Sequence, residues 1–144
     1  EADDGILKSQ RILLTWMIDD ANVLQQIRRV IRSDDFTEPL YRTVAELLYQ
    51  QMDEGLVNPA QIMNHFSDEE EHRKVAELFH TKIRELTTRE EQEKALNETV
   101  RRVKQNSLDE MARRLEPTDI AGLQKLMEDK RALQDAKGLH ISII

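Results

Sequence analysis

No glycine or proline occurs in residues 88–115, whose sequence is TREEQEKALNETVRRVKQNSLDEMARRL. Thr88 is followed three residues later by Glu91, and this spacing is the capping box that marks the start of a helix. A helix that continues from Thr88 almost to Pro117 has about 27 residues and is roughly 40 Å long. That length exceeds the diameter of a compact bundle built from 144 residues. We therefore expect one long helix to serve two parts of the molecule.

Apolar residues form two stripes on this helix. The first stripe consists of Leu96, Val100 and Val103, and the second of Leu108, Met111 and Leu115. At about 100° per residue, the second stripe is rotated by roughly a quarter-turn or more from the first. The change falls at the polar residues 104–107, where we expect the helix to be able to bend or break, because neither core covers them. A single continuous core with a few polar positions is the alternative.

The rest of the chain predicts shorter helices, so the expected fold is all-α. The first predicted helix covers residues 7–19, the second is capped by Asn22, and the third is capped by Thr37 and ended by Gly55. A fourth covers residues 58–66, and a fifth begins with a capping box at Ser67-Asp-Glu-Glu70. The last predicted helix is capped by Thr118 and ended by Gly138. We expect residues 1–5 to be a linker, residues 6–103 a helical bundle, and residues 104–144 a helical hairpin with an apolar tail.

The composition limits the classes of function. The chain has no cysteine, which excludes disulfides, thiolate zinc sites and cysteine nucleophiles from it, and fits a reducing cytoplasm. A net charge of −7 argues against a general nucleic-acid binder, whose affinity depends on neutralising phosphates. No apolar run approaches membrane-spanning length. Because there is no initial methionine, we expect a fragment of a longer protein.

Residues that could carry chemistry are few. The two Glu-x-x-His patterns, Glu69…His72 and Glu77…His80, have the spacing of di-iron bundles, but both lie on one helix. His72 shares a face with apolar residues, so a half-buried packing role is the alternative. Asp19-Asp20 and Asp34-Asp35 are expected to be solvated loop residues. We expect no catalytic residue, no bound cofactor and no metal ligand.

Basic residues cluster modestly along the chain. One cluster, Arg28, Arg29 and Arg32, lies near the end of the second predicted helix, where dipole compensation and surface ion pairs are the ordinary role. A local phosphate-binding patch is the alternative.

The predicted hairpin carries the strongest functional signal. We expect Leu108, Met111 and Leu115 to face three residues of the last helix across a seam. Those three residues are Ile120, Leu123 and Met127. Other apolar residues then lack cover, and an exposed apolar strip is typical of a protein interface. The predicted partner-binding residues are Leu126, Lys130, Leu133, Leu139 and Ile141, and the alternative is that the hairpin folds back onto the bundle.

Several stretches resemble a known family, the C-terminal helicase-binding domain of bacterial DNA primase. The stretches are Gln10-Arg-Ile-Leu-Leu-Thr-Trp-Met-Ile-Asp-Asp20, Asp34-Asp-Phe-Thr-Glu-Pro-Leu-Tyr-Arg42, Leu47-Leu48 with Gly55, the long helix with its hairpin, and the Leu-His-Ile-Ser end at 139–142. The first half also resembles the N-terminal domain of the replicative helicase, whereas the hairpin and the end of the chain favour primase.

The resemblance implies a cytoplasmic bacterial replication protein. Its hairpin would dock on the N-terminal collar of the hexameric helicase within the primosome. Primer synthesis, a nucleotidyl transfer, would belong to zinc-binding and polymerase domains that lie outside this chain. From the charge and the lack of a long apolar run, we expect no membrane contact and no direct nucleic-acid binding by this part of the protein. Exchange of hairpins between two copies of the chain would be a route to self-association. The alternative functions are the N-terminal oligomerisation domain of the replicative helicase and a small helical metalloenzyme.

Overall fold

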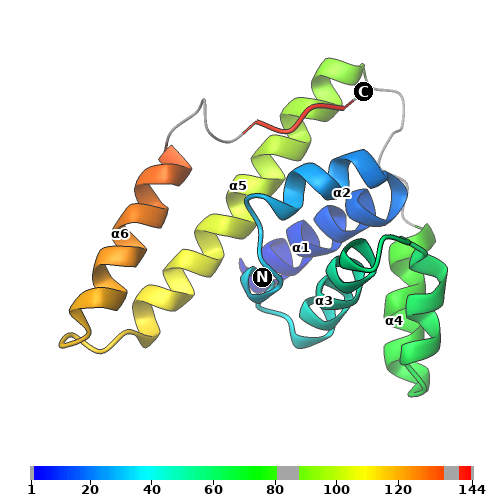
Figure 1. The fold of residues 1–144 in the computed structure, drawn as a ribbon, viewed down its shortest axis with the longest axis horizontal. Helices are drawn as coiled ribbons and strands as arrows, with labels where there is room; N and C mark the ends of the chain where they lie inside the picture. Colours follow the sequence, from blue (N-terminus) through cyan, green and yellow to red (C-terminus); the bar gives the residue numbers. More distant parts are fainter. Residues whose placement is uncertain (1, 81–87, 135–139, 144) are drawn as a thin grey trace.

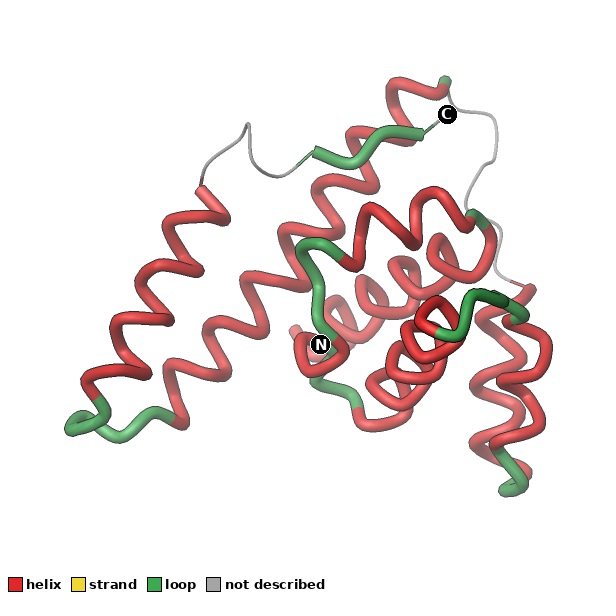
Figure 2. The backbone as a smooth tube through the Cα atoms, in the orientation of Figure 1, coloured by secondary structure: helices red, strands yellow, loops and turns green. Residues whose placement is uncertain are grey.

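The computed structural model of the chain describes residues 2–80, 88–134 and 140–143, with side chains from residue 5 onward. All regular elements in these ranges are helices, as predicted (Figures 1 and 2). In chain order they are α1 (Ala2–Asp19), α2 (Ala21–Arg28), the 3₁₀ helix η1 (Ser33–Asp35), α3 (Pro39–Asp53), the 3₁₀ helix η2 (Pro59–His65), α4 (Glu69–His80), α5 (Arg89–Arg114) and α6 (Ile120–Gln134).

The core of the bundle forms around α1. Helices α2, α3, α4 and the first half of α5 surround α1 (Figure 1). Each contributes an apolar face at helical spacing, which removes that face from water and supplies the main stabilisation of the fold. The largest fully buried apolar side chains are Phe36, Leu13, Leu14, Met17, Leu24, Ile27, Ile31, Leu48, Leu78, Leu96 and Leu108.

Some predicted helix boundaries are confirmed. Gly55 has a φ of 81° and follows α3, and the backbone N–H groups of Gly55 and Leu56 donate to Met52 and Gln51. This pair of bonds is the Schellman motif, in which glycine tolerates the left-handed backbone. Thr88 caps α5, because its Oγ1 accepts a hydrogen bond from the Glu91 N–H at 3.1 Å.

Other boundaries differ from the prediction. Helix α1 begins at Ala2, so the expected linker over residues 1–5 is wrong for residues 2–5. Acidic side chains accept the capping bonds of three helices, namely Asp20 instead of Asn22, Asp68 instead of Ser67, and Asp119 instead of Thr118. Thr37 lies one residue before the α3 cap position, and its Oγ1 accepts a hydrogen bond from buried Gln10. The predicted end at Gly138 lies outside the described residues.

Helix α5 runs without interruption through residues 104–107, the segment that was expected to be able to bend or break. The expected lack of cover is wrong, because this segment packs against η1. The buried carboxylate of Asp35 accepts hydrogen bonds from Lys104 Nζ at 3.0 Å and from Ser107 Oγ at 2.6 Å. Asp35 Oδ2 also accepts the Arg32 backbone N–H at 2.8 Å. The expectation of a solvated Asp35 is therefore wrong as well.

The second half of α5 leaves the bundle and pairs with α6 as a hairpin (Figure 1). Gly122 allows the tight connection at its tip, because a Cβ there would lie 2.6 Å from both the Asp119 carboxylate and the Leu115 side chain. Near the other end of α6, Arg101 donates from Nη1 to the carbonyl oxygen of Leu133. The two helices are thus fastened at both ends.

Replacing Asp35 with alanine is expected to lower the free energy of unfolding by about 3 kcal/mol, because it leaves the Lys104 ammonium without its buried partner. Urea denaturation would measure the loss. The matched control is Asp34→Ala, since Asp34 is exposed and carries the same charge. Equal effects of the two substitutions would contradict this role of Asp35.

Tyr49 predicts a loss of stability at alkaline pH. Its hydroxyl donates to the Ile31 carbonyl oxygen at 2.7 Å, and burial, reinforced by the Asp35 charge, raises its pKa well above the ordinary value of 10.0. The unfolded chain therefore releases this proton first. The contribution is fully present below pH 10.0 and is lost as the pH rises further. In denaturant titrations, the loss of stability between about pH 8 and about pH 11 should be smaller in Tyr49→Phe than in the parent chain.

Candidate partner-binding surface

Helix α6 exposes the apolar face that was expected to be its seam with α5. Ile120, Leu123 and Met127 are 68%, 37% and 58% exposed. Leu126 and Leu133, predicted to bind a partner, are only 5% and 7% exposed, because they form the seam with α5. The assignment of the two faces was therefore reversed. Ile120, Leu123 and Met127 are called the α6 strip below.

The remaining predicted partner-binding residues differ in how far they are exposed. Ile141 is 2% exposed, so the expectation of an uncovered apolar tail is wrong for this residue. Lys130 is half-buried on α6, and Leu139 lies outside the described residues. On α5, Met111 is 39% exposed, which differs from its predicted place in the seam. Leu115 is half-buried and lies against Gly122 of α6, as its predicted place in the seam requires.

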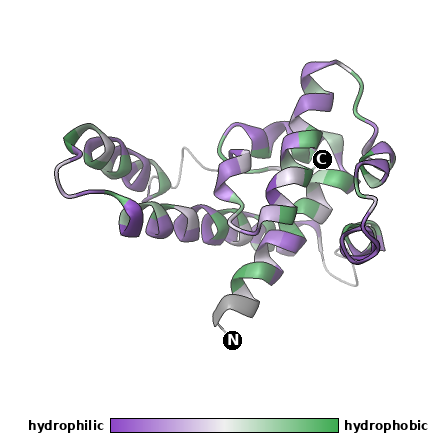
Figure 3. Ribbon diagram, turned by 90° about the horizontal axis from the view of Figure 1, so that it is seen from below, coloured by the Kyte–Doolittle hydropathy of each residue, from purple (hydrophilic) through white to green (hydrophobic). Residues whose placement is uncertain are grey.

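The two apolar faces of α6 differ in direction by about 100° around the helix axis. The i, i+3, i+7 spacing of the α6 strip gives it the geometry of a helical recognition face. Figure 3 shows hydrophobic colour on the hairpin, at the left of the view and away from the bundle. Such a strip is the chemistry that a partner helix or groove would cover.

A cleft of about 430 Å³ lies between the bundle and the hairpin. Arg29 and Arg32 line it from the bundle, and Met111 and Lys125 line it from the hairpin. Three aspartates also line the cleft, which lowers its net positive charge. The cleft therefore combines apolar side chains with more basic than acidic ones.

The basic cluster near the end of α2 is partly paired, as the ordinary role predicts. Arg28 makes an ion pair with Asp53 at 2.7 Å and lies over the Tyr49 ring, and its hydrogen bond holds the pKa of the Asp53 carboxyl below the ordinary value. Arg29 and Arg32 make no ion pair with any side chain that the structure describes. The phosphate-patch alternative stays a prediction for these two residues.

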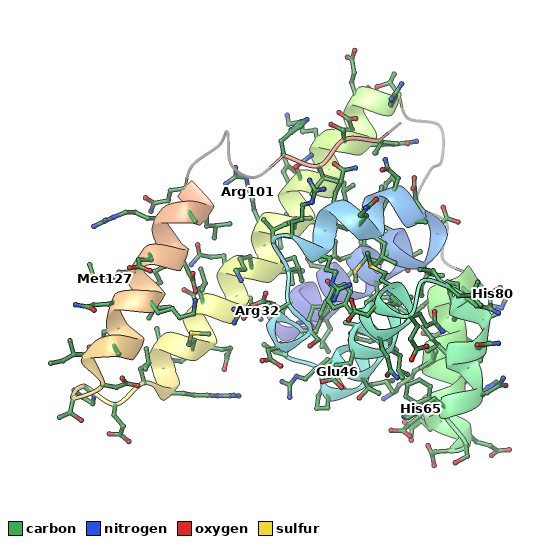
Figure 4. All side chains as sticks on the ribbon, viewed as in Figure 1. Arg32, Glu46, His65, His80, Arg101 and Met127 are labelled. Atoms are coloured by element: carbon green, nitrogen blue, oxygen red, sulfur yellow. The ribbon has the colours of Figure 1, made fainter. Side chains whose placement is uncertain are left out.

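The Glu-x-x-His patterns do not converge on a site. Within residues 5–80, 88–134 and 140–143, no group of three or more histidine or acidic side chains could hold a metal ion. His72 is exposed, which corrects its predicted half-buried packing role. In Figure 4, His65 and His80 lie on the side of the bundle opposite to Met127 and the hairpin. The expectation of no catalytic residue, cofactor or metal stays a prediction.

Comparisons with family models, with curated proteins and with solved structures found no match. None of the helices in the described part of the chain combines the length and apolar character needed to cross a membrane.

Because the seam of α6 is formed by Leu126 and not by Met127, substitutions at these two neighbours should lower the free energy of unfolding by very different amounts. Leu126→Ala should lower the free energy of unfolding by about 2–4 kcal/mol, because it removes a buried side chain from the seam. Met127→Ala is the matched control and should change it by less than about 0.5 kcal/mol, because its side chain is mainly in water. Thermal and urea unfolding of both variants would measure the difference, and a larger loss from Met127→Ala would contradict the observed seam.

Proposed function

We propose that this chain is the helicase-binding domain of a bacterial DNA primase. It binds the N-terminal collar of the hexameric replicative helicase, recruits primase to the replication fork and modulates the activities of both enzymes. The parent protein carries the DNA-directed RNA polymerase activity in other domains, and this domain works as an interaction module in the bacterial cytoplasm.

The α6 strip is the observation that carries this proposal. Three large apolar side chains remain in water although the chain has buried most of its other apolar residues. Covering a side chain of this size on a partner contributes roughly 1.5–3 kcal/mol before the costs of association. The strip lies on the hairpin, which is where the resemblance to primase places the helicase contact. This agreement of exposed chemistry with the resemblance supports the assignment.

The experiment is to titrate the chain with the hexameric replicative helicase of the source bacterium and to measure binding by size-exclusion chromatography and fluorescence anisotropy. Substituting Ile120→Gln and Met127→Gln together should weaken binding at least tenfold, because it removes two apolar contacts while glutamine retains helix propensity. Helicity should hardly change.

The matched control is Leu56→Gln, an equally drastic change at an exposed apolar residue after α3, 72% exposed. It should bind like the parent chain. Unchanged binding by the double variant would move the interface away from the α6 strip, and the basic cleft residues Arg29 and Arg32 would be tested next. Failure of the parent chain to bind helicase, with the chain forming rings alone, would favour the helicase N-terminal domain instead.

A further inference from the structure

The segment 140–143 runs along the first half of α5 and contacts α2 (Figure 1). It belongs to no helix or sheet, so its backbone has no ladder of its own. Even so, all six backbone N–H and C=O groups of Ile141, Ser142 and Ile143 make hydrogen bonds to side chains. Buried backbone groups need such partners, and here two helices supply them.

Two side-chain amides each bind both backbone groups of one residue. Asn97 Oδ1 accepts the Ile141 N–H at 2.7 Å, and Asn97 Nδ2 donates to the Ile141 carbonyl oxygen at 2.9 Å. Gln26 Oε1 accepts the Ser142 N–H at 2.9 Å, and Gln26 Nε2 donates to the Ser142 carbonyl oxygen at 2.8 Å. Each amide therefore takes the place that a neighbouring strand has in a sheet.

The third residue is held in the same manner by two charged side chains. Glu93 Oε1 accepts the Ile143 N–H at 2.6 Å, and Arg89 Nε donates to the Ile143 carbonyl oxygen. Arg89, Glu93 and Asn97 are spaced by four residues, which places them in one row on α5. Gln26 faces this row from α2.

The two amides are oriented by their own helices before they meet the segment. Asn97 Nδ2 also donates to the Glu93 carbonyl oxygen at 2.8 Å, and Gln26 Nε2 to the Asn22 carbonyl oxygen at 3.4 Å. Each –NH₂ group uses one hydrogen for its helix and leaves the other for the segment. The oxygen atom of each amide is thereby fixed toward an incoming N–H group.

Apolar contacts add a side-chain preference to this backbone recognition. Ile141 and Ile143 are buried in the groove, whereas Ser142 between them is half-buried. Alternate residues of an extended segment point to opposite sides. The segment therefore buries an isoleucine side chain at every second position.

We propose that the groove defined by Gln26, Arg89, Glu93 and Asn97 is a peptide-binding site for an extended apolar-x-apolar segment. The chain's own residues 141–143 occupy it, and the same segment of a second copy of this chain takes their place when they are withdrawn. The recognition is the backbone capture of strand addition, carried out by side chains instead of a sheet edge. None of the six hydrogen bonds depends on how the segment is joined to the rest of the chain.

The test uses the full chain with Ile141→Ser and Ile143→Ser, which removes both apolar anchors from the segment without shortening the chain. The probe is a fluorescein-labelled peptide with the sequence His-Ile-Ser-Ile-Ile of residues 140–144, standing in for the segment of a second copy. In fluorescence polarisation, the double variant should bind the peptide at least tenfold more tightly than the parent chain, whose groove is filled. A control peptide with serine in place of the isoleucines of positions 141 and 143 should bind neither the double variant nor the parent chain.

Adding Gln26→Ala and Asn97→Ala to the double variant should weaken peptide binding at least tenfold. The matched control adds Gln25→Ala and Glu98→Ala, exposed neighbours on the same two helices, and should retain binding. A double variant that unfolds cooperatively yet binds no peptide would overturn the proposal, as would binding that is unaffected by the loss of both amides.

A second measurement needs no altered segment. In the parent chain, hydrogen exchange at the amides of residues 141–143 should be at least tenfold slower than in the free peptide. Asn97→Ala should remove most of that protection while the α1 amides keep theirs. Exchange at peptide rates in the parent chain would overturn the proposal even if the double variant failed to fold.

Discussion

The carboxylate of Asp35 fixes how α5 lies against the bundle, and the position of the hairpin depends on it. The connection between α2 and α3 has only the short η1 helix to satisfy its backbone, so side chains from other helices complete its hydrogen bonds. From α3, Tyr49 and Arg42 donate to the backbone carbonyl oxygens of Ile31 and Phe36. From α5, Lys104 and Ser107 donate to the Asp35 carboxylate. A buried charge is tolerated only with such partners. Sliding α5 along the bundle by a single turn would separate Asp35 from both of its α5 partners, so this cluster sets the direction in which α5 carries the hairpin outward.

The all-α fold and the order of the helices could be predicted because their signals are local. Gly55 and Thr88 act on residues within one turn, and both were identified correctly. Capping residues were missed where two candidates are near each other, because the backbone angles at the helix entrance choose between them; Asp20, with an extended backbone, caps α2 although Asn22 is also a good capping residue. Residues 104–107 were misjudged for the opposite reason. The partner that covers Lys104 and Ser107 is 69 and 72 residues away in the sequence, and a polar run on a helix carries no sign of it.

The reversal of the α6 faces has a geometric cause. Leu126 and Leu133 form one apolar stripe, and the α6 strip forms another about 100° away, so the sequence of α6 supports either face as the seam. The choice is made in the first turn of α6, where Gly122 lets the helix lie close to Leu115, and near its end, where Arg101 binds the Leu133 carbonyl oxygen. An exposed apolar strip on the hairpin was expected, and one is present. Which residues form the exposed strip depends on the contact between α5 and α6, and the sequence of α6 alone does not show that contact.

The segment 140–143 was the least predictable part of the molecule. Ile141 and Ile143 read as an uncovered apolar tail because their partners, Gln26, Glu93 and Asn97, are ordinary polar residues of helix surfaces. Their contact has a consequence for α6. Five residues join α6 to this segment, so the bundle holds the hairpin from both sides, through α5 at one end and through residues 140–143 at the other. Tying down both ends reduces the number of orientations open to the hairpin. When a partner covers the α6 strip, the hairpin therefore loses less conformational entropy than a hairpin attached at one end would lose. This smaller cost favours tight association through a small apolar surface.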